Sequence, residues 1–388
     1  MAGAEVAELQ GSARVSPVDF RTRMPALDGL RGMAILLVFL YHYAGDSDQH
    51  PASLVLKGMY AITGLGWMGV DIFFVLSGFL ITGILYDTRN DSGYFRKFYA
   101  RRTLRIFPIY YLYVALVAVA GVAMGIHWRW LQASFLFYVG FPVALAWPQI
   151  IPASPYLRVT HLWSLCVEEQ FYLLWPLLIR LLSSSRRILA ACAVILIAAP
   201  LLRVGVWASG TLSPAWAYAS LPCRMDDLAI GASLAILLRG SGGEHAKNAA
   251  PFVLFGSLAA LAVLLLDSGS VSHDAPGVFT LGYSLIAMIA GSILVLGVTS
   301  EGVITSVLKQ PGLRLLGKYS YGFYLYHFPL AAVLDPAKPL LNRLLHSVLL
   351  AKGIFVVFGF FLNLGIAAAS FHWIEAPIMR LKNRFQYS

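Results

Sequence analysis

The stretch Leu27-Asp-Gly-Leu-Arg-Gly-Met-Ala-Ile-Leu-Leu-Val-Phe-Leu-Tyr-His-Tyr-Ala44 places an arginine and a histidine in an otherwise apolar helix. Arg31 and His42 are eleven residues apart, which in an α-helix is three turns plus roughly 20°, so both lie on one stripe about 16 Å apart along the axis. Ionisable side chains within a membrane helix are costly and normally face the bundle interior. The alternative is an arginine at the lipid headgroups and a histidine satisfied by a neighbouring carbonyl.

The composition is that of an integral membrane protein. Of the 388 residues 59% are hydrophobic and 12% are charged, and the mean hydropathy is +0.71, which departs from soluble averages. The net charge of +10 comes from short basic loops between apolar runs, a pattern that orients membrane proteins and argues against nucleic-acid binding. Cys166, Cys192 and Cys223 have no metal-ligand spacing, so we predict neither a metal site nor a disulfide framework.

Apolar runs near 20 residues predict an all-α polytopic membrane protein with ten transmembrane helices. Most Lys and Arg residues fall on one side if both termini are cytoplasmic, which is the orientation we predict. Residues 1–24 then form a cytoplasmic tail, and 25–384 form a single membrane domain with no appended soluble domain. Residues 128–147 are predicted to be an extracytoplasmic interfacial or re-entrant segment, because a full crossing there would move a later basic cluster outside. The expected spans are 27–45, 62–86, 106–126, 162–179, 188–206, 223–238, 250–266, 279–298, 319–334 and 348–372.

A basic motif precedes the third span, in Phe98-Tyr-Ala-Arg-Arg-Thr-Leu-Arg-Ile-Phe-Pro-Ile-Tyr-Tyr111. Arg102 and Arg105 are three residues apart and Arg101 and Arg105 are four apart, so their guanidinium groups can share a helix face. Convergent arginines suit the binding of phosphates. Ordinary positive-inside charge explains the spacing equally well.

Two carboxylates open the fourth span, in His161-Leu-Trp-Ser-Leu-Cys-Val-Glu-Glu-Gln-Phe-Tyr172. Ser164, Glu168 and Tyr172 follow one another at four-residue spacing and therefore lie on one stripe, with Glu169 beside it. Such acids could bind sugar hydroxyls or position a base. The alternative is a helix N-terminus stabilised by negative charge.

Further polar residues lie in the second and sixth spans. Asp71 is a single carboxylate at an estimated depth close to that of His42, so we predict that it orients the imidazole. Arg224, Asp226 and Asp227 open the sixth span and can pair among themselves.

The ninth span carries Ser320, Tyr324 and His327 on one helix face. His327 is the rival of His42 for the role of catalytic histidine. If the span begins at residue 319, His327 lies about two turns from the cytoplasmic end, near mid-membrane. We therefore predict that His42 is the catalytic residue and that His327 can contact the acyl arm or Tyr324 without meeting the acceptor.

In order, the motifs LDGLRG with a following histidine, GVDIFFVLSGFLI, RRxxRIxPxY, WSLxVEEQFY, SYGFYLYHxP and ExPxxR resemble the acyltransferase-3 family of integral-membrane acyltransferases. The resemblance covers 25–384. It implies transfer of an acyl group, usually acetyl from acetyl-CoA, to a hydroxyl of a carbohydrate or another small acceptor. It also implies that Arg31 and His42 serve catalysis and that Arg102 and Arg105 bind CoA.

Residues and resemblance together predict an O-acetyltransferase of the bacterial cytoplasmic membrane, surrounded by lipid, that acts on a cell-surface polysaccharide or its precursor. CoA phosphates bind at the arginines, His42 removes a proton from the acceptor hydroxyl, and Glu168 or Glu169 holds the acceptor. An acyl-histidine intermediate is the variant. Some relatives carry a C-terminal hydrolase-like domain, so this chain is expected to act alone or to pass the acyl group to a separate protein. Alternatives are a cytoplasmic acceptor such as an antibiotic or lipid precursor, a proton-coupled transporter, or a membrane scaffold.

Overall fold

The computed structural model describes residues 24–45, 54–123, 125, 159–210 and 214–387. Within these residues all regular structure is helical, which confirms the predicted all-α membrane fold. The segment 128–147 and nearly all of the predicted N-terminal tail lie outside the described residues.

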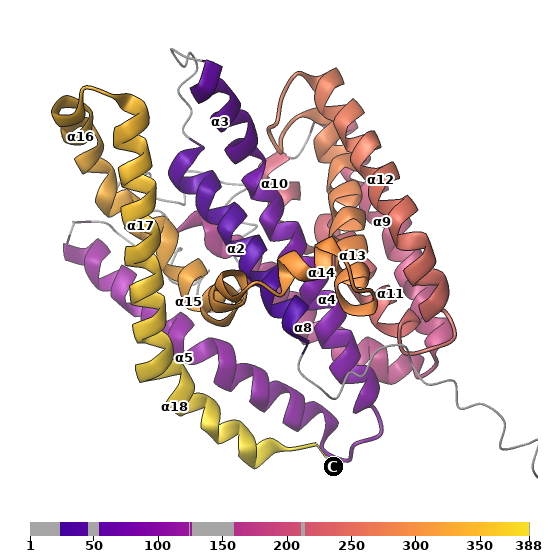
Figure 1. Cartoon of the computed structure of the whole chain (residues 1–388). Helices are drawn as coiled ribbons and strands as arrows, with labels where there is room; N and C mark the ends of the chain where they lie inside the picture. The colour runs from indigo at the N-terminus through magenta and orange to yellow at the C-terminus, as the bar shows by residue number, and fades with distance from the viewer. Residues whose placement is uncertain (1–23, 46–53, 124, 126–158, 211–213, 388) are drawn as a thin grey trace, which may run out of the picture.

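Long helices form a bundle in which α2 and α4 occupy the centre (Figure 1). The principal helices, in chain order, are α2 (Pro25–Ala44), α3 (Leu54–Gly64), α4 (Gly69–Asp87), α5 (Tyr94–Ala123), α8 (Trp163–Leu182), α9 (Ser185–Ser209), α10 (Pro214–Ala219), α11 (Leu221–Leu237), α12 (Gly243–Ser268), α13 (Tyr283–Thr299), α14 (Val303–Leu308), α15 (Pro311–Leu334), α16 (Lys338–Leu345), α17 (Val348–Ser370) and α18 (Ala376–Met379). Short tighter or wider turns join several of them: η1 (Leu65–Met68), η3 (Thr160–Leu162), η4 (Val278–Gly282), η5 (Asp335–Ala337), η6 (Phe371–Glu375) and η7 (Arg380–Phe385).

Each of the ten expected spans overlaps a helix, but α5 and α15 begin well before residues 106 and 319, and the end of the expected span 106–126 lies outside the described residues. In the described part of the chain, six helical stretches are long and apolar enough to cross a membrane by length and composition. The four spans outside that set are α2, α8, α11 and α15. These helices carry most of the arginines, acids and histidines singled out above, and those residues lower their hydropathy.

Lipid-facing and central helices differ in what they expose. Peripheral helices turn large apolar side chains outward, for example Phe252 and Leu266 on α12 and Phe361 on α17. Figure 1 shows α12 and α17 on opposite sides of the bundle. Because lipid solvates such side chains, this exposure is what a membrane bundle requires.

Glycines bring the central helices into backbone contact. A Cβ added to Gly317 of α15 would lie 1.8 Å from the carbonyl oxygen of Asp28 in α2, and one added to Gly78 of α4 would lie 2.0 Å from that of Leu228 in α11. No side chain fits at these distances, so only glycine allows the two approaches. The α2 and α15 helices are thereby fixed against each other, as are α4 and α11.

Candidate active site

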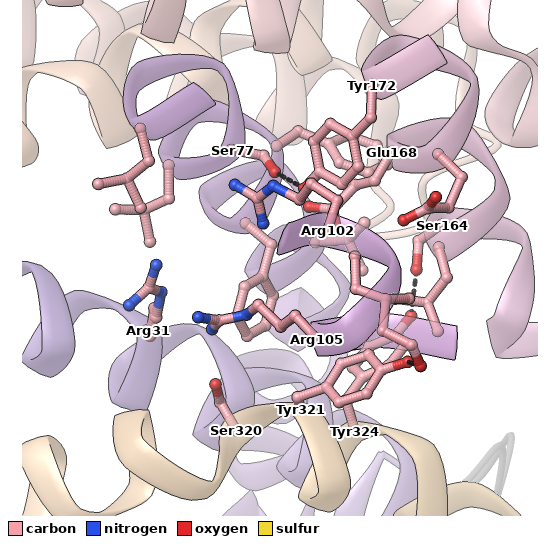
Figure 2. A pocket seen from close by; sticks show the side chains of 18 residues that line it. Arg31, Ser77, Arg102, Arg105, Ser164, Glu168, Tyr172, Ser320, Tyr321 and Tyr324 are labelled. Atoms are coloured by element: carbon pink, nitrogen blue, oxygen red, sulfur yellow. Dashed lines mark hydrogen bonds between the residues drawn. The ribbon is translucent and has the colours of Figure 1, made fainter. Parts of the chain in front are cut away.

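A cavity of about 110 Å³ lies among α2, α4, α5, α8 and α15. Its wall combines basic, acidic and hydroxyl side chains from all five helices (Figure 2). The polar residues of the wall are Arg31, Ser77, Arg102, Arg105, Ser164, Glu168, Glu169, Tyr172, Ser320, Tyr321 and Tyr324. The structure thus brings together residues from five motifs that are far apart in the sequence.

Three guanidinium groups gather on one side of this cavity. Arg31 comes from α2, whereas Arg102 and Arg105 come from α5, which is already helical from Tyr94. Figure 2 shows the guanidinium groups of Arg31 and Arg105 turned toward each other. Like charges held this close repel, so an anion between them would be stabilising.

The neighbouring Arg101 points elsewhere and does not line the cavity. Its Nη1 donates to the carbonyls of Lys382 and Phe385, at 3.4 and 3.2 Å, and its guanidinium lies 5.4 Å from the centre of the Tyr387 ring. Arg101 therefore holds the C-terminal segment against α5. The structure does not place it with the two arginines with which it was predicted to bind CoA.

The same C-terminal segment places a further basic residue beside α5, a position that the sequence did not predict. Lys382 lies in η7, which packs against α5, the helix that carries Arg102 and Arg105. Nothing in the sequence places η7 beside α5, because this packing arises only when the C-terminal segment folds back along that helix.

One face of α8 supplies the acidic side of the cavity. Ser164, Glu168 and Tyr172 all line it, as their four-residue spacing predicts, and Glu169 lines it as well. The hydroxyls of Tyr172 and Ser77 hydrogen-bond each other, and Arg102 lies over the Tyr172 ring, 4.8 Å from its centre. The Oε1 atom of Glu169 is buried without a hydrogen-bond partner, so it can accept from a bound hydroxyl or amide.

Tyr324 separates the cavity from a group of histidines. Its hydroxyl lies 2.5 Å from Ser164 Oγ and donates to the carbonyl of His161 at 2.9 Å. Its ring is 5.4 Å, centre to centre, from both His161 and His327.

The histidine cluster consists of His42, His161 and His327. Nδ1 of His42 and Nε2 of His327 are 3.0 Å apart, and the His161 and His327 rings are 5.3 Å apart, centre to centre. We did not predict a role for His161, because it lies just before the first full turn of α8 and carries no periodic signal. Arg31 and His42 thus occupy two depths of α2, as predicted, one at the cavity and one at the cluster.

The predicted depth of His327 is wrong. Helix α15 begins at Pro311 and not at residue 319, so His327 lies about two turns farther along the helix than expected. It therefore sits at the level of His42. The start of the helix was misplaced because the charged residues Arg314 and Lys318 lower the hydropathy of its first turns.

The prediction that Asp71 orients His42 is also wrong. Asp71 Oδ1 lies 2.6 Å from Arg224 Nη2, and the same nitrogen lies 2.9 Å from Asp227 Oδ2. The close approach of α4 to α11 directs Asp71 toward α11 and away from α2. Asp71, Arg224 and Asp227 are fully buried and form an ion-pair cluster separate from the cavity wall.

Only part of the expected pairing within that cluster is confirmed. Arg224 pairs with Asp227, as predicted, but Asp226 pairs with Arg203 of α9, with two N–O distances of 3.0 and 2.8 Å. Ser284 of α13 also donates to Asp226. These contacts join α4, α9, α11 and α13 and indicate a structural role.

The fold is that of a membrane protein whose cavity gathers basic side chains near a histidine cluster. The profile of an acyltransferase domain family matches residues 24–372, and the chain belongs to this acyltransferase-3 family. No solved structure matches the chain.

Two curated relatives are named for peptidoglycan O-acetylation. The chain is 29% identical to the putative peptidoglycan O-acetyltransferase YrhL of Bacillus subtilis, over 92% of this chain and 55% of that one. It is 28% identical to the peptidoglycan O-acetyltransferase OatA of Listeria monocytogenes, over 93% and 56%. A putative O-acetyltransferase of Staphylococcus aureus is 27% identical, over 92% and 57%. The chain thus spans a little over half the length of these relatives.

Proposed function

We propose that the chain transfers an acetyl group from acetyl-CoA to a hydroxyl of a cell-wall polysaccharide or its precursor. The observation that carries this proposal is the gathering of Arg31, Arg102 and Arg105 on one side of a cavity that ends beside the histidine cluster. Family membership supports acyl transfer, and the names of the relatives support acetyl and peptidoglycan.

The donor would bind with its phosphates at the three arginines and its acyl arm along the cavity toward Tyr324. Guanidinium groups bind phosphate through paired charge-assisted hydrogen bonds, which fits the anionic end of CoA. The thioester end would then lie close to the histidine cluster. Glu169, with its unpartnered Oε1, and Glu168 are the groups we assign to holding the acceptor or the arm.

In the transfer step, His42 takes the proton of the acceptor hydroxyl while the oxygen attacks the thioester carbonyl. The carbon–sulfur bond breaks and the CoA thiolate leaves. His42 then passes its proton to the thiolate. In the variant with an acyl-histidine, the imidazole itself attacks and the acceptor hydroxyl displaces it. Trapping of label from acetyl-CoA on the protein without acceptor distinguishes the two.

Replacing Arg102 and Arg105 together by alanine tests the donor site. Charge-assisted hydrogen bonds contribute roughly 1.5–3 kcal/mol each, so CoA affinity should fall by an order of magnitude or more. Binding of CoA to detergent-purified protein, measured by calorimetry, gives the result. Arg101→Ala is the matched control, because it removes the same charge from the same helix outside the cavity. Unchanged affinity in a folded double variant, or an equal loss in Arg101→Ala, would contradict the assignment.

For orientation, we propose that both termini and the arginine side of the cavity face the cytoplasm. A cysteine introduced at Ser272 should then react with an impermeant thiol reagent added to intact cells, whereas one at Ser92 should not. The native Cys166, Cys192 and Cys223 are buried, so background labelling should be low. The reverse pattern would invert the topology. Labelling at Ser184 would mean that residues 128–147 cross the membrane.

A further inference from the structure

Two histidines of the cluster are joined by a hydrogen bond whose direction the surrounding carbonyls determine. His327 is completely buried, and its Nδ1 lies 2.7 Å from the carbonyl oxygen of Tyr324. Its Nε2 lies 3.0 Å from Nδ1 of His42. Nδ1 of His42 also lies 3.0 Å from the carbonyl oxygen of Val38, one turn earlier in α2.

A carbonyl oxygen only accepts, so the hydrogen of the Tyr324 contact must be on Nδ1 of His327. A neutral imidazole has a single N–H, which leaves Nε2 of His327 as an acceptor. We take His327 as neutral because an ionised, fully buried imidazole is costly. The donor facing it must therefore be Nδ1–H of His42, which is shared with the Val38 carbonyl.

This fixes the state of His42 in which it can act as a base. A base has to be neutral before it accepts a proton, and neutral His42 with its hydrogen on Nδ1 carries its lone pair on Nε2. We propose that His327 is a positioning residue of the transfer, which holds His42 in this tautomer and ring orientation so that Nε2 receives the proton of the acceptor. The inference rests on the proposed function of His42, but the tautomer itself can be measured independently.

His327 also stabilises His42 after His42 has accepted the proton. When Nε2 of His42 is protonated, Nδ1–H keeps its acceptor on His327, so the charged ring forms without a change in the hydrogen-bond pattern. An aspartate has this role in serine hydrolases. A neutral imidazole stabilises the cation less than a carboxylate does, so the loss of His327 should cost less than the loss of His42.

The kinetic test compares two replacements at position 327. His327→Leu removes the acceptor and should lower kcat about 10–100-fold, in the range seen for groups that orient a reactive ligand, with KM for acetyl-CoA nearly unchanged. His327→Gln can offer its side-chain oxygen to Nδ1–H of His42 and should recover most of the rate. Equal rates for the leucine variant and the wild type, or a glutamine variant no better than the leucine one, would overturn the proposal.

The direct test is the tautomer of His42, read from ¹⁵N chemical shifts of histidine-labelled protein in nanodiscs. The signals are assigned by their loss in His42→Gln and His327→Gln. We expect Nδ1–H on neutral His42 in the wild type and a shift toward Nε2–H in His327→Leu. Nε2–H on His42 in the wild type would refute the inference. Nδ1–H that persists in the leucine variant would also refute it, since the Val38 carbonyl alone would then be enough to hold this tautomer. Because this measurement needs no acceptor, it stands even if no acyl transfer is detected.

Discussion

Replacing His42 by alanine is expected to lower kcat by about 10²–10⁴-fold, the usual contribution of a general base. Affinity for CoA should change by no more than a few fold, because His42 lies at the histidine cluster beyond Tyr324 and does not line the cavity with the arginines. A loss in kcat without a loss in donor binding is the signature of a group that acts in the transition state.

The rate is measured with labelled acetyl-CoA and a peptidoglycan oligosaccharide, and donor binding is measured on the same preparation. His245→Ala is the control, since His245 is exposed on α12, outside the cavity and the cluster. If the His42 variant keeps more than about a tenth of the wild-type rate, an effect below roughly 1.4 kcal/mol, the base is another residue.

Replacing Arg224 by alanine should give the largest loss of stability. Its side chain is fully buried between Asp71 and Asp227, at 2.6 and 2.9 Å, and lies over the Tyr283 ring, 4.2 Å from its centre. Removal of one partner from a buried ion pair costs about 3–5 kcal/mol, because it leaves uncompensated charge in the interior. Here two carboxylates would be left.

Thermal unfolding in detergent provides the measurement. Arg239→Ala is the matched control, because Arg239 also pairs with an aspartate, but that aspartate, Asp87, is half-exposed. The contribution of that pair should be no more than about 1 kcal/mol. Equal destabilisation by the two variants would show that the cluster contributes no more than a surface pair. Adding Asp71→Asn to the Arg224 variant should restore part of the stability.

Sequence periodicity predicted the parts of the site that lie on one helix. Ser164, Glu168 and Tyr172 reach the cavity together because four-residue spacing fixes their relative directions whatever the tertiary structure. The separation of Arg31 from His42 along α2 follows from the same geometry. The two arginines of α5 could likewise be paired from their spacing.

Contacts between helices could not be predicted in this way. Asp71 meets Arg224 because Gly78 brings α4 against α11, and hydropathy gives no information on which faces of two helices meet. His161, which reaches the histidine cluster from the short turn before α8, has no periodicity to reveal it. The start of α15 was misplaced because charged residues in its first turns lower the local hydropathy.

The central claim is that the cavity carries an acyl group from CoA to a hydroxyl at the histidine cluster. Its most direct test uses purified protein in liposomes, with acetyl-labelled CoA on the side where a cysteine at position 92 is accessible and a peptidoglycan oligosaccharide on the opposite side. The account predicts base-labile label on the oligosaccharide with the wild type and almost none with His42→Ala or the Arg102/Arg105 double variant. Folded wild-type protein that neither binds CoA nor transfers label would contradict it.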